Sequence, residues 1–253
     1  MSGRRIPRLW TMSDLAPGVA VPLSAGQTHH LRTVLRLGPG APVAAFNATD
    51  GEWLCRIGDT GGRAAADRTA LLVEHPLRPA AAEPDLWLLF APIKRLRLEW
   101  LIEKATELGV SAFLPVWTRH TQTERLNLDR LQAHAIAAAE QSERLSVPEL
   151  RPPRALASVL AEWAAGRRLF VCDETGAGEP VGTAATRLGP GPTALLTGPE
   201  GGFDETELDR LGKLFFVTRI GLGPRVLRAD TAAVAALSAF QAIVGDWSRI
   251  RRR

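Results

Sequence analysis

The chain has 253 residues, of which 45% are apolar, and it carries a formal net charge of +4. These values exclude a disordered tail and predict a folded protein with one large domain or two smaller ones. No uncharged apolar run reaches the roughly 18 residues of a membrane-spanning helix. The arginines of "MSGRRIPRLW" are not followed by the apolar segment of a secretory signal, so we expect a cytoplasmic protein.

The basic residues are mostly arginine, since only three of the 31 are lysine. Arginine suits phosphates and bases, which makes the excess compatible with an RNA partner, but a biased genome composition explains it equally well. Cys55 and Cys172 lie far apart and predict no disulfide framework. The five histidines lack the spacing of metal ligands, so we predict no metal site.

Residues 1–75 have the pattern of a small β-rich domain. A short helix is predicted between its first strands, where the apolar residues around His29 precede a Gly-Pro-Gly stop. The turn sequence "NATDG" favours a hairpin between two of the three predicted strands, 41–46, 51–58 and 69–75. Residues 76–85 contain three prolines and no periodicity, which predicts a linker.

Residues 86–253 alternate between predicted strands and helices, which indicates an α/β domain around a mostly parallel sheet. Asp204 and Glu207 form a capping-box pattern at the start of one helix. The last helix is expected at 230–247, with an apolar stripe that includes Trp247. The predicted strands are 86–93, 111–117, 167–174, 193–198 and 214–223, and the two other long helices are 95–109 and 127–144.

Two glycine-rich loops follow neighbouring strand patterns, "TGPEGGF" at 197–203 and "GLGPRVLR" at 221–228. In open α/β sheets, ligands bind beyond the carboxyl ends of strands. Neither loop has the lysine of a phosphate-binding loop or a dinucleotide pattern, and Glu200 would repel a polyphosphate. A phosphate-free nucleoside with a positive reactive centre, such as S-adenosylmethionine, fits better. Two ordinary tight turns with a solvated Glu200 explain the spacing equally well.

The two stretches "LLTGPEGGFDETEL" and "GLGPRVLRADTAAVAAL" together look like the paired signatures of the RsmE family, the bacterial 16S ribosomal RNA uridine-N3 methyltransferases of the SPOUT superfamily. The segments "RIPRL", "HHLRTVLRLGPG", "EWLIEKATELGV" and "AAAEQSERLSVPEL" extend the resemblance over nearly the whole chain. The resemblance implies a PUA-like β-barrel at 1–75, and a SPOUT α/β domain with a trefoil knot, an S-adenosylmethionine site and a homodimer interface at 86–253. The chain departs from the family's Thr-Glu-Thr at Ala229-Asp230-Thr231, which makes an orienting role for Asp230 less certain than one for Arg228.

The resemblance places the cofactor against the two glycine loops. The apolar members would sandwich adenine and the glycines would offer backbone groups, while packing of the strand ends into the core is an alternative for Leu196, Ile220 and Leu222. The expected cofactor-binding residues are Leu196, Thr197, Gly198, Glu200, Gly201, Gly202, Ile220, Gly221, Leu222, Gly223 and Leu227.

Attack of uridine N3 on a methyl group requires loss of the N3 proton, and negative charge then develops on O2 and O4. A fixed guanidinium would stabilise that charge, and Arg228 is the first choice with Arg225 second. A phosphate clamp or an ion pair with Asp230 is the alternative for these arginines. Glu140 is a candidate general base, although a surface helix position explains it as well.

The reacting edge of a paired uridine must be extruded, which argues for a second region that grips the RNA backbone. We expect this grip from the N-terminal domain, with Arg32 and Arg36 on one face of its short helix, although such a face is often merely solvated. The expected RNA-binding residues are Arg5, Arg8, His29, Arg32 and Arg36.

Two rival functions stay open, a methyltransferase that modifies the ribose 2′-oxygen or another RNA atom, and an RNA-binding assembly factor with a vestigial pocket. A nucleotide-dependent enzyme would lack its phosphate motif.

Overall fold

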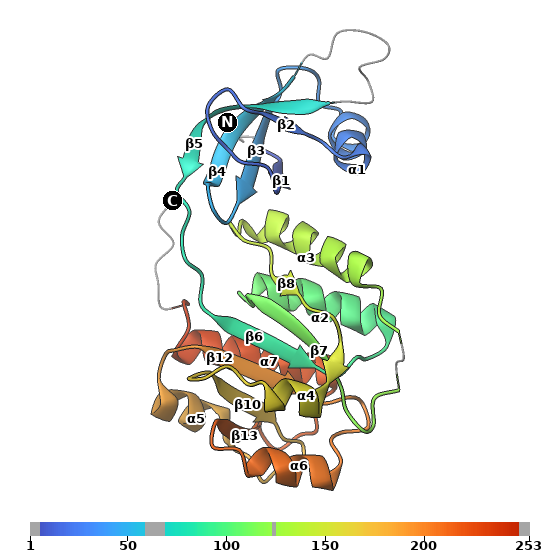
Figure 1. Ribbon diagram of the computed structural model, residues 1–253, viewed down its shortest axis with the longest axis vertical. Helices are drawn as coiled ribbons and strands as arrows, with labels where there is room; N and C mark the ends of the chain where they lie inside the picture. Colours follow the sequence, from blue (N-terminus) through green and yellow to red (C-terminus); the bar gives the residue numbers. More distant parts are fainter. Residues whose placement is uncertain (1–5, 59–68, 123–124, 248–253) are drawn as a thin grey trace. The chain divides into compact units, whose positions relative to one another are not determined.

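A computed structural model describes residues 6–58, 69–122 and 125–247 of the chain (Figure 1). The chain divides into two units. Unit 1 comprises Met1–Ala82 and Ala139–Val147, and unit 2 comprises Glu83–Ala138 and Pro148–Arg253. In the described residues no helix is long and apolar enough to span a membrane.

Unit 1 is built on a five-stranded sheet in the order β1-β3-β4-β5-β2. The β1–β3 pair is parallel and the other pairs are antiparallel. The predicted turn closes the β3–β4 hairpin, where Asn47 Oδ1 accepts hydrogen bonds from the backbone N–H groups of Thr49 and Asp50. The strands are β1 (Arg8–Trp10), β2 (Ala20–Pro22), β3 (Pro42–Asn47), β4 (Gly51–Ile57) and β5 (Ala70–Arg78).

Strand β5 continues to Arg78, three residues into the segment expected to be a linker. It extends that far because Glu52 at the start of β4 pairs with Arg78 in the sheet, and the two side chains form an ion pair. One face of the sheet buries an apolar cluster that includes Leu31, Val43, Ile57 and Val73.

The short helix of unit 1 has two parts, α1 (Ala25–His29) and a π-helical turn, η1 (His30–Val34). A capping box between Ser24 and Gln27 starts it. Arg36 lies beyond its end with a φ of 55°, in the left-handed region. The prediction that Arg32 and Arg36 share one helical face is therefore wrong, because the α-helical spacing does not continue that far.

Unit 2 contains a parallel sheet in the order β11-β13-β10-β12-β6-β7-β8, with β9 paired to β7. Every pair in it is parallel, which confirms the predicted fold class. The strands are β6 (Leu86–Phe90), β7 (Ala112–Trp117), β8 (Glu149–Leu150), β9 (Arg154–Ala155), β10 (Arg168–Cys172), β11 (Glu179–Pro180), β12 (Thr193–Thr197) and β13 (Val217–Gly221).

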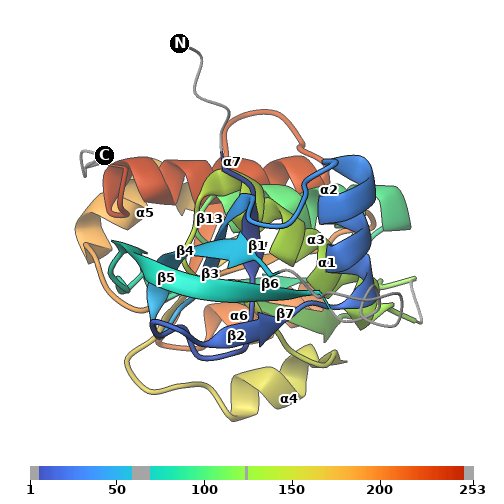
Figure 2. The ribbon, with the colours of Figure 1, turned by 90° about the horizontal axis from the view of Figure 1, so that it is seen from above.

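Helices cover both faces of this sheet, so its central strands are apolar on both sides. Figure 2 shows α2, α5 and α7 along one face and α4 and α6 along the other. The helices are α2 (Arg95–Glu107), α3 (Leu128–Ser142), α4 (Leu156–Ala161), α5 (Val181–Leu188), α6 (Glu205–Gly212) and α7 (Ala229–Ile243). The last residues of α3, from Ala139, belong to unit 1.

The start of α6 and the end of α7 test two predictions about the helices. The capping box is confirmed, since the Asp204 side chain accepts from the first turn of α6 and Glu207 bonds back to the Asp204 backbone. The last helix is shorter than predicted, because α7 ends at Ile243 and leaves Trp247 exposed beyond it. The short elements α4, α5, β8, β9 and β11 were not predicted, because segments of two to eight residues carry too little periodicity.

Candidate functional site

A pocket of about 1020 Å³ lies at the carboxyl ends of three neighbouring strands, β13, β10 and β12. This volume is at the upper end of the roughly 300–1,000 Å³ that small-molecule sites occupy. The lining comes from residues 172–176, 178 and 180 at the end of β10 and after it, 197–200 and 202 at the end of β12, and 221–229 and 232 around the start of α7, with Lys94 and Arg97 beside them. The position agrees with the rule that ligands bind beyond the carboxyl ends of parallel strands.

Two contacts, one at Gly198 and one at Glu200, fix the position of the loop after β12. The Phe203 side chain is buried against this loop, and a Cβ added to Gly198 would lie 3.0 Å from the Phe203 ring, a contact closer than most in proteins. On the other side Glu200 Oε1 accepts a hydrogen bond of 3.3 Å from the backbone N–H of Lys94, just before α2. Glu200 therefore shapes the loop and also lines the pocket.

The loop after β10 supplies the middle wall, and sequence reasoning missed it. The Asp173 side chain is fully buried and accepts hydrogen bonds from the N–H and hydroxyl of Thr175. Burial alone would raise the pKa of Asp173, but the hydrogen bonds from Thr175 and the Arg219 guanidinium, 2.7 Å away, outweigh it and hold the pKa below its usual value. A charged Asp173 thus fixes the turn that begins this loop.

Glu174 links the middle wall to the loop after β12. Its Oε1 accepts a hydrogen bond of 3.0 Å from the backbone N–H of Phe203. Gly202, with a φ of 72°, makes room for this carboxylate, since a Cβ there would lie 2.2 Å from Glu174 Oε1. The sequence signal that could have identified this loop is "CDETGAG", an Asp-x-Thr turn followed by two glycines directly after an apolar strand.

The loop after β13 contributes the cationic wall. Arg225 and Arg228 both line the pocket and are exposed, and in the described residues neither makes an ion pair. Arg228 stands at the N-cap of α7 without capping it through its side chain. The Asp230 carboxylate is paired with Arg97, at 3.7 Å between Nη1 and Oδ1, and not with Arg228 as the alternative interpretation supposed.

Most of the predicted cofactor residues line the pocket. Three do not: Leu196 and Ile220 are fully buried at strand ends, and Gly201 packs against His120. The side chains of Leu196 and Ile220 therefore pack into the core, as the alternative interpretation of these two residues proposed. The charged lining residues that sequence reasoning did not select are Lys94, Arg97, Asp173 and Glu174. The predicted residues in the lining are Thr197, Gly198, Glu200, Gly202, Gly221, Leu222, Gly223, Arg225, Leu227 and Arg228.

Comparison with known proteins decides the family. A model of an RNA methyltransferase domain matches residues 81–241, and a model of an RNA methyltransferase PUA domain matches 23–66. A ribosomal RNA small subunit methyltransferase E from Rickettsia conorii is 31% identical over 91% of this chain and 93% of its own length. The chain belongs to this family of RNA methyltransferases.

Solved structures of relatives also match nearly the whole chain. A ribosomal RNA small subunit methyltransferase E from Neisseria gonorrhoeae, bound to S-adenosyl methionine, has a TM-score of 0.85 at 25% identity over 96% of this chain and 100% of its own. A putative methyltransferase from Legionella pneumophila, in complex with the same cofactor, has a TM-score of 0.83 at 28% identity over the same shares of the two chains. The PUA domain followed by an α/β methyltransferase domain confirms the predicted fold class.

Glu140, the candidate base, belongs to unit 1 and does not line the pocket. Its Oε1 accepts a hydrogen bond of 3.0 Å from the Trp10 backbone N–H, and burial raises the pKa of its carboxyl group. This contact fixes the end of α3 to β1 and gives Glu140 a structural role in unit 1, whereas its catalytic role stays a prediction.

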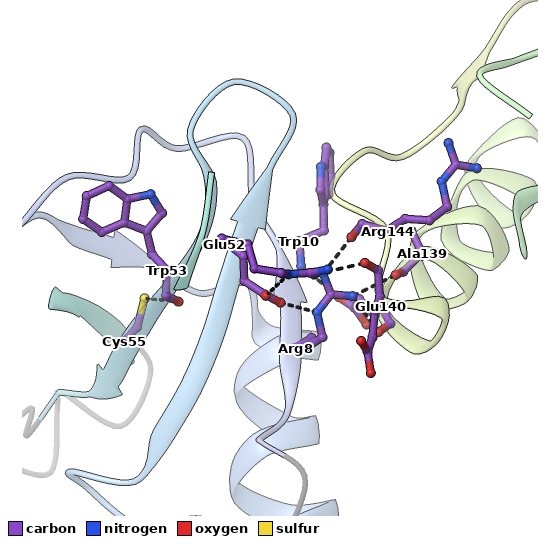
Figure 3. A network of polar contacts seen from close by, with 10 residues as sticks. Arg8, Trp10, Glu52, Trp53, Cys55, Ala139, Glu140 and Arg144 are labelled. Carbon is purple, nitrogen blue, oxygen red and sulfur yellow. Dashed lines mark hydrogen bonds and ion pairs between the residues drawn. The ribbon is translucent and has the colours of Figure 1, made fainter. Parts of the chain in front are cut away.

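Arg8 is also engaged within unit 1 (Figure 3). Its guanidinium pairs with Glu52 and donates to the carbonyl oxygens of Ala139, Glu140 and Arg144 at the end of α3. Four donated hydrogen bonds and a nearly buried side chain give Arg8 a structural role within unit 1, whereas its RNA-binding role stays a prediction.

The remaining predicted RNA-binding residues lie at the surface of unit 1. His29 and Arg36 are exposed and Arg32 is half-buried. Arg5 lies outside the described residues. The family's PUA match covers all three described residues.

Proposed function

We propose that this chain transfers a methyl group from S-adenosylmethionine to N3 of a uridine in 16S ribosomal RNA of the small subunit. The observation that carries this proposal is the pocket itself, in which two glycine loops and a middle acidic loop meet beside two arginines that form no ion pair with any described residue. Membership of the small subunit rRNA methyltransferase family supports the reaction class and the RNA substrate. Relatives with bound S-adenosylmethionine support the choice of cofactor.

The pocket fits this cofactor in size and in chemistry. Glycines 198, 202, 221 and 223 present only backbone atoms to the pocket, and Leu222 and Leu227 offer apolar surface for a base. The carboxylates Glu174 and Glu200 suit a cation and oppose a polyphosphate. When bound, S-adenosylmethionine supplies an electrophilic methyl group next to a positively charged sulfur.

The arginines of the loop after β13 act on the RNA base. As the N3 proton leaves, negative charge spreads to the two flanking carbonyl oxygens, and a guanidinium held against them stabilises it. Arg228 is our first candidate for this role, supported by its position at the N-cap of α7, where the helix dipole adds positive potential. Arg225 is the second candidate, since it lines the same wall.

The proposal also includes an RNA contact by unit 1, a homodimer and a cytoplasmic location. His29, Arg32 and Arg36 of the PUA-type unit contact the RNA backbone. The enzyme is a homodimer, and the exposed apolar residues Leu96 and Trp100, four apart on α2, are candidates for its interface. It works in the cytoplasm, where ribosomal subunits are found. The trefoil knot of the family likewise stays a prediction.

Methyl transfer to purified 30S subunits, followed by mass spectrometry of the released nucleosides, tests the reaction. The rival enzyme, a 2′-O-ribose methyltransferase, would yield a 2′-O-methylated nucleoside, and an assembly factor with a vestigial pocket would yield none. Calorimetric titration with S-adenosylmethionine separates that assembly factor from either enzyme, because only the enzymes would bind the cofactor.

A further inference from the structure

Two carboxylates in the pocket wall, Glu174 and Glu200, are not neutralised by a basic side chain. In the described residues neither forms an ion pair. The other acidic groups near the pocket differ in this respect, because Asp173 is paired with Arg219 and Asp230 with Arg97. The pocket wall therefore carries two exposed carboxylates that have no ion-pair partner in the described part of the chain.

Each of these carboxylates is fixed by one backbone hydrogen bond from another segment. Glu174 Oε1 accepts from Phe203 N and Glu200 Oε1 accepts from Lys94 N. In the described part of the chain, the second oxygen of each carboxylate accepts no hydrogen bond. One oxygen thus sets the position of the side chain, and the other remains available to the contents of the pocket.

Basic residues line the same pocket but come from other segments. Lys94 and Arg97 lie at the start of α2, and Arg225 and Arg228 lie in the loop after β13. The acidic pair comes from the loops after β10 and β12. The acidic and the basic side chains of the pocket thus come from different segments of the chain. A ligand that fills the pocket displaces water, which strengthens the effect of both on any charge it carries.

We propose that Glu174 and Glu200 make the pocket selective for the charge of the methyl donor, so that it binds S-adenosylmethionine in preference to its product S-adenosylhomocysteine. The inference rests on the proposed function. In the reaction the bond from sulfur to the methyl carbon breaks and its electron pair stays on sulfur, while the new bond forms to uridine N3 and the N3 proton passes to solvent. The sulfur changes from a cation to a neutral thioether, and the two carboxylates lose their attraction for the product.

Isothermal titration calorimetry of the full chain with both compounds tests this inference. The ratio of the Kd of S-adenosylhomocysteine to that of S-adenosylmethionine is measured for the unmodified protein and for Glu174→Gln and Glu200→Gln. Each substitution keeps an oxygen that can accept the backbone hydrogen bond but removes the charge. Each should lower the ratio by about three- to tenfold, the size expected for one partly screened charge at close range.

Glu162→Gln is the matched control, since it removes an exposed carboxylate of unit 2 that is paired with Arg154 and does not line the pocket. Its ratio should equal that of the unmodified protein. An equal loss of affinity for both compounds in the Glu174 and Glu200 variants would overturn the inference and leave the two residues a purely structural role. Unchanged affinities would overturn it as well.

A measurement on the unmodified protein covers the case in which a variant fails to fold. Rising salt should weaken binding of S-adenosylmethionine more than binding of S-adenosylhomocysteine, because only the first carries the sulfonium charge. Parallel salt dependences would contradict charge selection. Failure of the unmodified protein to bind either compound would instead contradict the proposed function, so the two failures are distinguishable.

Discussion

Arg228 combines three properties that a charge-stabilising residue needs. It lines the pocket, it starts a helix that points its positive end at the same space, and in the described residues no carboxylate neutralises it. Arg97 also lines the pocket, but its guanidinium lies 3.7 Å from Asp230. The residue in the pocket that is best suited to a developing anion is therefore Arg228.

Replacing Arg228 should slow methyl transfer without abolishing cofactor binding. Arg228→Ala should lower the single-turnover rate by about 100-fold, the cost of losing one preorganised donor to a developing negative charge. The Kd for S-adenosylmethionine should change little, and calorimetry measures it in parallel. Arg225→Ala serves as the comparison, with a smaller expected loss. A larger loss of rate for Arg225→Ala would reverse the two assignments.

Gly202 shows why a glycine is required at one point of the pocket wall. Gly202→Ala should destabilise the protein through its positive φ, at about 1–2 kcal/mol, and further through the clash with Glu174. Gly166→Ala is the matched control, because Gly166 also has a positive φ, 78°, but has open space around its Cβ position. Urea unfolding of both variants measures the difference, and equal losses would show that Glu174 moves aside freely.

The two glycine loops were predictable from the sequence because each combines glycines with an apolar strand before it and a helix after it. The middle loop around Glu174 was not predicted, because its position depends on strand order. Strand β10 precedes β12 and β13 in the chain but lies between them in the sheet. Chain order alone does not reveal which loop fills the centre of a site.

Among the elements of unit 1, β1, β4, β5 and the end of α3 are joined by one ionic network. Glu52 lies between Arg8 and Arg78, and Arg78 also donates to the Glu143 carbonyl. Burial alone would raise the pKa of Glu52, but hydrogen bonds from Arg78 and Arg8 outweigh it and hold the pKa below its usual value. Burial lowers the pKa of Arg8, against the opposing effect of Glu52. The network depends on the Glu52 charge.

Removing that charge should destabilise the protein and change its response to acid. Glu52→Gln should cost about 3 kcal/mol at neutral pH, the lower part of the range for a broken buried ion pair. Because the pKa of Glu52 is depressed by folding, its contribution is present above the unfolded-state pKa and is lost as the pH falls through the folded-state pKa. The difference between the two proteins in urea unfolding should therefore shrink at acidic pH.

Glu74→Gln provides the control for this network, since Glu74 is paired with Arg56 at the surface of the same unit. Its loss should cost less than about 1 kcal/mol, as for other exposed pairs. A cost for Glu52→Gln no greater than that for Glu74→Gln would show that the network does not stabilise unit 1. The sequence did not indicate this network, because its members are separated by up to 136 positions.

In the whole molecule, we propose that the PUA-type unit contacts the RNA and that the methyltransferase unit carries out methyl transfer. Arg32→Ala combined with Arg36→Ala should weaken binding of 30S subunits and reduce its salt dependence, because fewer counterions are released per complex. The affinity for S-adenosylmethionine should stay unchanged, which calorimetry checks. Unaltered RNA binding at low and moderate salt would remove these arginines from the RNA contact.

The fold class was predictable at this scale because a β-rich N-terminal part and alternating strands and helices differ in period. The contacts of individual charged residues within a unit were less predictable. Arg8 was expected to grip RNA, yet its guanidinium is enclosed by Glu52 and three backbone carbonyls. The sequence shows that a residue is charged, but it does not show with which groups that residue forms ion pairs or hydrogen bonds.

Methylation of uridine N3 in small subunit rRNA is the reaction that we propose for this chain. Its most direct test is transfer of a tritiated methyl group from S-adenosylmethionine to purified 30S subunits, followed by nucleoside mass spectrometry. We expect radioactivity in the 16S RNA and 3-methyluridine among its nucleosides, with both accumulating about 100-fold more slowly in Arg228→Ala. A 2′-O-methylated nucleoside, or no incorporation by a protein that binds the cofactor, would contradict it.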